Sequence, residues 1–264
     1  MLRPLDLSAL RDSYVTAKPF PFVKIDNFLE PGAASLIAAS FPTFENALAT
    51  GQTFKTVNER KKIQVTKSEL FPSPIAKLNE ALASPEFLRD LSRITGIPNI
   101  LADPELIGGG IHITGPGGRL DVHVDFNYIQ HRQLHRRANL LLYFNPTWSE
   151  SWGGQIQLWD REVKRCEAAF APIFNRCVIF ETSYESFHGV TPVAEAATVP
   201  RQSFATYYYT KEAPKGWDGR VHSTIFKARP EERIRGLLLM PMEVFSGKVK
   251  GQIRKIKDHV KRLK

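Results

Sequence analysis

The sequence predicts an α+β protein, mainly β, in which an N-terminal helical layer packs on a β sandwich or barrel. Residues that begin and end helices are concentrated in the first third of the chain. From about Ile107 onward, short runs rich in β-branched and aromatic residues alternate with glycine, proline and asparagine. Strands of this length and spacing, without helices between them, are typical of a sandwich or barrel.

The helical layer is predicted from its end signals. The expected elements are a strand over residues 21–29 and helices over residues 31–41, 74–83 and 84–96. The last helix has the clearest signature, with Ser84 at the cap, Pro85 just inside and Gly96 after the end. Residues 52–66 are polar and basic with weak periodicity, and predict no regular element.

The β part is predicted from six runs. These are GIHIT (110–114), LDVHVDF (120–126), NLLLYFN (139–145), GGQIQLW (153–159), RCVIFE (176–181) and RQSFATYYYT (201–210). GPGG at 115–118 is expected to be a turn, the pair Gly153-Gly154 a turn or bulge, and Trp159 a core residue. We expect one domain over residues 1–246 with its β core at about 105–212, followed by a separate basic segment at 247–264.

The net charge of +9 does not by itself indicate nucleic-acid binding. Residues 247–264 hold eight Lys or Arg and one acid, so this segment accounts for +7 and the rest of the chain is almost neutral. A phosphate-binding groove would spread its positive charge over the working face. We therefore expect no nucleic-acid partner.

Hydropathy and cysteine content suggest a cytoplasmic protein without a membrane span. The longest apolar runs are far below the roughly 20 residues that a bilayer requires. Asp6, Arg11 and Asp12 interrupt the N-terminus where a signal peptide needs an apolar run. Cys166 and Cys177 have no metal-binding spacing and fit a reducing compartment.

A candidate metal site lies in the run LDVHVDF. His123 and Asp125 are two residues apart, so in a strand their side chains point to the same face. His188, on another predicted strand, supplies a second imidazole. Two histidines and one carboxylate on one side of a cation leave the other positions open for a co-substrate and oxygen. The alternative is that these are ordinary hydrogen-bonded side chains.

Arg201 is a candidate anion-binding residue. Alternation in RQSFATYYYT places Arg201, Ser203, Ala205, Tyr207 and Tyr209 on one face. A guanidinium inside a barrel needs an anion, and a carboxylate bound by two hydrogen bonds is its natural partner. A surface position, or a salt bridge to an internal acid, would also explain this arginine.

These motifs together carry a family resemblance. The series HVD, NLLLYFN, W-x4-GG-x-I-x-LWD, HGVTPV and R-x-S-x-A-x-YYY, over about residues 105–212, resembles the 2-oxoglutarate/Fe(II)-dependent oxygenases, in particular the prolyl-4-hydroxylase-like branch. The resemblance implies a double-stranded β-helix, or jelly roll, with the metal near its open end. It also implies Fe(II), the co-substrate 2-oxoglutarate and O2, with ascorbate as a supporting reductant.

The resemblance assigns roles to individual residues. His123, Asp125 and His188 match the metal ligands, and Arg201, with Ser203 beside it, matches the residue that binds the distal carboxylate of 2-oxoglutarate. Three further residues are expected to help bind the co-substrate: Tyr143, Asn139 and His112. Core packing for Tyr143, and a hydrogen-bonded structural role for His112, remain alternatives.

The implied reaction is hydroxylation of an unactivated C–H bond with release of succinate and CO2. Asp125 favours hydroxylation, because related halogenases have a small residue there. The nucleic-acid demethylase branch has a second arginine where this chain has Tyr207. The rivals are a cupin-like metal-binding β-barrel with other or no catalysis, and a binding module that has lost its chemistry.

The motifs fit several classes of substrate: a peptidyl proline, an amino acid, a sugar derivative or a natural product. Loops over the barrel mouth are expected to select it, at residues 44–66, 126–138 and 213–226. The segment 247–264 has apolar residues at helical spacing and predicts a basic amphipathic helix. That helix could pack on the core, form a homodimer, or contact an acidic partner or anionic membrane surface.

Overall fold

The N-terminal part of the chain forms the helical layer that its end signals predict. The computed structural model describes residues 1–56 and 58–232, in which the helices are α1 (Leu7–Thr16), α2 (Pro31–Ser40), α3 (Phe44–Thr50), α4 (Ser73–Leu82) and α5 (Pro85–Thr95), with short 3-10 helices η1 (Ser68–Leu70), η2 (Glu150–Trp152) and η3 (Pro230–Glu232). The Ser84 hydroxyl caps α5 by accepting a hydrogen bond from the Phe87 N–H, and Gly96 ends this helix with φ of 72°. The predicted α2, α4 and α5 are confirmed, whereas α1 and α3 are additional.

The β part forms one curled antiparallel sheet. Its strands are β1 (Phe22–Ile25), β2 (Gln52–Lys55), β3 (Glu59–Val65), β4 (Leu101–Ala102), β5 (Gly110–Val124), β6 (Tyr128–Ile129), β7 (Leu134–Tyr143), β8 (Ile156–Trp159), β9 (Cys166–Phe170), β10 (Cys177–Glu181), β11 (His188–Val190), β12 (Arg201–Thr210) and β13 (Ile225–Phe226). The main path runs β1-β10-β7-β12-β5-β11-β8-β9. Strands adjacent in sequence are mostly not adjacent in this order, as in a jelly roll. The predicted fold class is confirmed.

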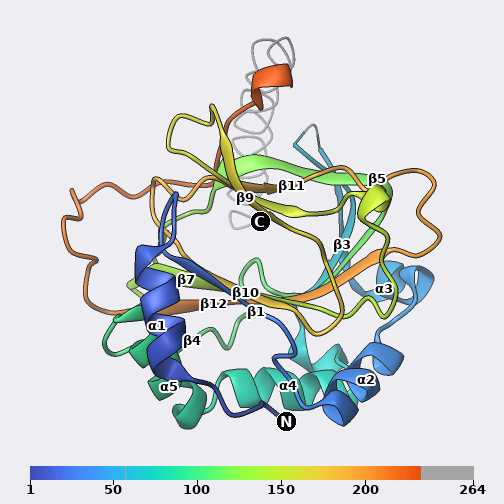
Figure 1. Cartoon of the computed structure of the whole chain (residues 1–264), viewed down its shortest axis with the longest axis horizontal. Helices are drawn as coiled ribbons and strands as arrows, with labels where there is room; N and C mark the ends of the chain where they lie inside the picture. Colours follow the sequence, from blue (N-terminus) through green and yellow to red (C-terminus); the bar gives the residue numbers. More distant parts are fainter. Residues whose placement is uncertain (57, 233–264) are drawn as a thin grey trace, which may run out of the picture.

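The sheet folds over on itself into two layers (Figure 1). β1, β10, β7 and β12 form the lower layer in this view, and β11 and β9 lie in the upper layer. Helices α1, α2, α4 and α5 cover the outer face of the lower layer, and α3 lies at the side of the sheet near β3. A large apolar cluster, which includes Phe28, Leu91 and Tyr208, fills the space between helices and sheet. A second cluster around Leu141, Tyr143 and Phe180 lies inside the fold, between the two layers.

The strand β5 corrects one prediction. The glycines at 115–118 do not end a strand, because β5 runs without interruption from Gly110 to Val124. Its first half pairs with β12 and its second half with β11 and β13, whereas β3 pairs with both halves. The glycines, with φ of 73° at Gly117, let one strand change partners between the layers.

Two of the three predicted mouth loops are also partly wrong. Residues 44–66 form α3 and the hairpin β2–β3, and β3 pairs with β5 as part of the sheet wall. Residues 134–138 belong to β7, and Arg136 within them is 2% exposed. These segments gain their structure from partners distant in sequence, which local periodicity does not reveal.

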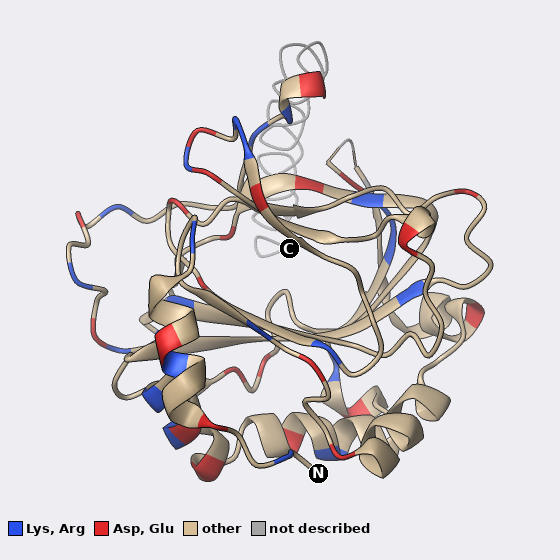
Figure 2. Ribbon diagram, viewed as in Figure 1, with Lys and Arg blue, Asp and Glu red and all other residues tan. Residues whose placement is uncertain are grey.

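The described residues contain no helix long and apolar enough to cross a membrane. Acidic and basic residues are interspersed along both layers (Figure 2). The predicted basic helix at 247–264 lies outside the described residues. Among the other predictions, Trp159 is buried against Val122 and Phe187, and Gly153 and Gly154 both have positive φ.

Candidate metal centre

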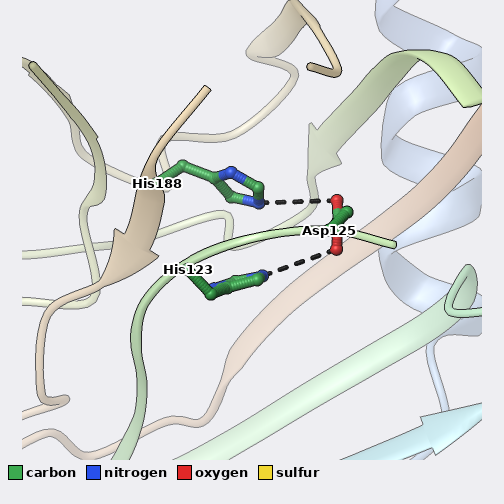
Figure 3. Close-up of side chains that lie close together, drawn as sticks. All are labelled: His123, Asp125 and His188. Atoms are coloured by element: carbon green, nitrogen blue, oxygen red, sulfur yellow. Dashed lines mark ion pairs between the residues drawn. The ribbon is translucent and has the colours of Figure 1, made fainter. Parts of the chain in front are cut away.

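The three predicted metal ligands converge at one point of the sheet. His123 lies near the end of β5, Asp125 follows directly after that strand, and His188 begins β11. β5 and β11 pair antiparallel with His188 opposite His123, so the two rings lie side by side with centroids 4.3 Å apart. Figure 3 shows both imidazoles directed at the Asp125 carboxylate.

Backbone carbonyls orient both imidazoles. His123 Nδ1 donates to the Asp121 carbonyl oxygen and His188 Nδ1 to that of Ser186, each over 2.9 Å. A carbonyl can only accept, so Nδ1 carries the hydrogen in both rings. In a neutral ring the lone pair of Nε2 is then directed at Asp125, as a metal ligand requires.

The distances fit a shared cation. His123 Nε2 lies 3.5 Å from Asp125 Oδ1, and His188 Nε2 lies 3.6 Å from Oδ2. One ligand atom from each residue can be chosen so that all three lie within 4.8 Å of one another. Two atoms bound to one ion at about 2.1 Å are at most about 4.2 Å apart, so a contraction below an ångström would let the group hold an ion.

His188 and Asp125 are in the protonation states that metal binding needs. Burial, followed by the neighbouring His123, lowers the pKa of His188 to about 4. Burial alone would raise the pKa of the Asp125 carboxyl, but opposing contributions, of which the positive charge of Arg136 is the largest, place the pKa below its usual value. At neutral pH the group therefore offers a neutral imidazole at His188 and a carboxylate at Asp125.

Arg201 lies in the interior, as its alternation predicts, and is 3% exposed. Its Nε donates to the Gly154 carbonyl (2.9 Å) and its Nη1 to the Ser203 hydroxyl (3.1 Å). Among the described residues, no carboxylate forms an ion pair with it. Burial lowers the pKa of this guanidinium. A buried cation without an acidic partner is costly, so the geometry favours an anionic ligand here.

The two histidines of the metal group share one cavity with Arg201. It is lined by Lys62, His112, Thr114, Arg119, Leu120, His123, Asn139, Leu141, Ile156, His188, Val190, Arg201 and Tyr207. Three buried polar atoms at this site have no hydrogen-bond partner: His112 Nε2, Asn139 Oδ1 and the Tyr143 hydroxyl, whose ring lies 4.9 Å from the Arg201 guanidinium. Buried polar groups are rarely left unpaired, so these atoms are available to a ligand. The structure thus brings all eight predicted site residues together.

Gly154 contributes more than the turn predicted for it. Its φ of 69° directs its carbonyl at Arg201, and a Cβ at this position would lie 3.0 Å from Trp148 and 3.3 Å from Arg201. A side chain there would crowd the guanidinium. The signal in the sequence was the glycine pair, which indicates unusual backbone but not its purpose.

Arg136 is the main site residue that the sequence analysis misses. It lies 3.5 Å from the Asp125 carboxylate and also lines a second, outer cavity of about 530 Å³. Other walls of this outer cavity include Thr182, Tyr184, Trp217 and His222. The Thr182 hydroxyl and His222 Nε2 are buried there without a hydrogen-bond partner. The predicted mouth loop at 213–226 contributes to this wall.

Comparison with known proteins agrees with the geometry. The 2OG-Fe(II) oxygenase superfamily matches residues 109–209. Prolyl 3-hydroxylase OGFOD1 of Mus musculus is 33% identical over 78 residues, which are 28% of this chain and 14% of that protein. The chain therefore spans only a small part of this relative.

Solved structures share the fold. A prolyl-4-hydroxylase of Pseudomonas putida has a TM-score of 0.56 and 16% identity, over 78% of this chain and 99% of that one. A prolyl hydroxylase of Trichoplax adhaerens, in complex with a hypoxia inducible factor peptide fragment, has a TM-score of 0.56 and 19% identity, over 78% and 91%. The resemblance inferred from the sequence motifs is confirmed, because the 2OG-Fe(II) oxygenase superfamily matches residues 109–209, which hold all of those motifs.

Proposed function

We propose that the chain is an Fe(II)- and 2-oxoglutarate-dependent dioxygenase that hydroxylates an unactivated C–H bond and releases succinate and CO2. One observation carries the proposal. The two histidines of a His-Asp-His group line one cavity with a buried guanidinium that has no acidic partner among the described residues. A dicarboxylate is the ligand that can reach both a cation and a guanidinium.

In this proposal His123, Asp125 and His188 hold the iron, and Arg201 binds the distal carboxylate of 2-oxoglutarate. The Ser203 hydroxyl accepts a hydrogen bond from Arg201 and so orients the guanidinium. Tyr143, Asn139 and His112 supply the remaining polar contacts through their unpaired atoms. The pKa of His112 is lowered well below its ordinary value by burial, so its neutral ring accepts or donates one hydrogen bond without adding charge.

The bound iron would supply the oxygen chemistry that no amino-acid side chain can perform. The protein's own residues bind and orient the two reactants and keep water out. The walls around His188 are suited to this, because Phe180 packs against its ring at 4.7 Å and Phe226 covers the His123 ring at 5.3 Å. Apolar walls of this kind limit solvent access to a metal site.

The outer cavity is the proposed substrate site. It adjoins the metal group through Arg136 and has a volume in the range of small-ligand sites. The similarity to prolyl hydroxylases makes peptidyl proline the first substrate to test. An amino acid, a sugar derivative and a natural product form the rest of the screen.

Succinate formation from 2-oxoglutarate, measured with Fe(II) and O2 and with or without ascorbate, tests the proposal. Wild-type protein should form succinate, faster with a true substrate present. His188→Ala should abolish this, whereas His131→Ala should not, because His131 is an exposed histidine paired with Glu105. A His188→Ala variant as active as wild type would contradict the proposal. Metal binding without 2-oxoglutarate turnover would favour the cupin-like alternative.

A further inference from the structure

Arg136 is held rigidly next to the candidate metal centre. Its guanidinium lies between two aromatic rings, 3.6 Å from the Phe126 centroid and 3.7 Å from that of Tyr207. Its Nη2 donates to the Ile107 carbonyl (2.9 Å) and to the Tyr209 hydroxyl (3.1 Å). Stacking fixes the plane of the group and the two hydrogen bonds fix its rotation in that plane.

The remaining arm of this guanidinium is directed at Asp125. Nη1 lies 3.5 Å from Oδ1, the oxygen that also lies 3.5 Å from His123 Nε2. Oδ2 is buried and has no hydrogen-bond partner. Oδ1 is thus held by the Arg136 guanidinium, while Oδ2 is available to bind a metal ion.

We propose that Arg136 is a positioning residue, which holds the Asp125 carboxylate so that it offers a single oxygen to the metal. The inference rests on the proposed function, because it requires that His123, Asp125 and His188 bind an ion. A carboxylate free to rotate could present both oxygens and take a second coordination position. Arg136 prevents this and so keeps a position open for the two reactants.

Charge and positioning predict opposite effects on metal affinity. A permanent positive charge near the site repels a divalent cation, so removing that charge should tighten metal binding. Loss of an outer partner that orients a ligand typically weakens metal affinity by about 10- to 100-fold. The sign of the change in affinity therefore separates the two roles.

The test is the affinity of metal-free protein for Mn(II), measured by calorimetry, together with the absorption spectrum of the Co(II)-loaded protein, which reports ligand number. Arg136→Met keeps an apolar side chain between the two aromatic rings and removes the guanidinium group. We expect Mn(II) binding about 10- to 100-fold weaker and an altered Co(II) spectrum. Arg136→Lys should also bind more weakly than wild type, because an amine restores the charge but not the fixed fork.

Arg132→Met is the matched control. It removes the same charge from a side chain that pairs with Asp103 at 2.9 Å, and it should leave the Mn(II) affinity and the Co(II) spectrum unchanged. Arg136→Met with wild-type or tighter Mn(II) affinity would overturn the inference, as would full recovery by Arg136→Lys. If thermal unfolding shows that Arg136→Met does not fold, Arg136→Lys decides. Wild-type protein that binds no Mn(II) would instead contradict the proposed function.

Discussion

Replacing Arg201 by methionine should stabilise the ligand-free protein while it damages the co-substrate site. The guanidinium is 3% exposed and has two hydrogen bonds but no ion pair among the described residues. Methionine forfeits those two bonds, each contributing about 1 kcal/mol. It also removes the desolvation penalty of a buried charge, which is several kcal/mol. We expect a net gain of about 1–3 kcal/mol in the free energy of unfolding.

The same variant should bind 2-oxoglutarate much more weakly. Two charge-assisted hydrogen bonds to the distal carboxylate contribute about 1.5–3 kcal/mol each. The loss of both, about 3–6 kcal/mol, corresponds to a fall in affinity of roughly 100- to 10,000-fold. Urea unfolding of metal-free protein measures the first effect. Calorimetric titration with 2-oxoglutarate in the presence of Mn(II), without turnover, measures the second.

Arg176→Met is the control for this pair of measurements. Arg176 has the acidic partner that Arg201 lacks, since its Nε lies 2.6 Å from Asp26 Oδ1. Its replacement should lower stability slightly and leave 2-oxoglutarate affinity unchanged. If Arg201→Met destabilised the protein and kept wild-type affinity, Arg201 would be a structural residue and the reasoning about the anion would be refuted.

Three further predictions concern other parts of the chain. Tyr143→Phe removes a buried hydroxyl that has no hydrogen-bond partner, so the stability of the metal-free protein should not change. The affinity for 2-oxoglutarate, measured by titration, should fall by roughly tenfold. Unchanged affinity would show that Tyr143 serves packing alone. The folded-state pKa of His188 is lowered to about 4, so its contribution to stability is complete above about pH 6.5 and is lost as pH falls toward 4. Between pH 6.5 and 5 the free energy of unfolding of the metal-free protein should fall by roughly 2 kcal/mol through this residue. Urea unfolding of His188→Gln should therefore show a weaker dependence of stability on pH than wild type. The same pH dependence in both proteins would contradict the lowered pKa of His188. Deletion of residues 247–264 should leave binding of Mn(II) and 2-oxoglutarate intact by calorimetry, and loss of 2-oxoglutarate binding would show that the segment belongs to the site.

The sequence was informative wherever local chemistry sets the structure. Ser84, Pro85 and Gly96 end a helix by hydrogen bonds and backbone conformations that only nearby residues supply. Alternation in β12 places Arg201 and Ser203 on the inner face, because a strand turns successive side chains to opposite sides. The same alternation places the side chains of His123 and Asp125 on one face.

It was less informative where pairing partners are distant. Residues 52–66 have weak periodicity, yet β3 forms because β5 offers an edge to pair with. The glycines at 115–118 resemble a turn when taken alone, but β5 passes through them because its two halves belong to different layers. Pairing over long sequence separations depends on which edges are free, and no local window contains that information.

Arg136 shows how long-range strand pairing can overrule a prediction made from local alternation. Strict alternation along β7 from Asn139 would place Arg137 and His135 on the inner face and Arg136 on the outer face. A bulge reverses this, since Ala138 pairs with Tyr208 and Arg136 with Tyr209, which leaves Arg137 unpaired between them. The sequence by itself predicted the candidate metal ligands, the interior position of Arg201 and the β-rich class, because strand alternation and residue chemistry are local. Only the tertiary structure brought Arg136 to Asp125, because one extra residue in a strand shifts the alternation and only the pairing with β12 reveals it.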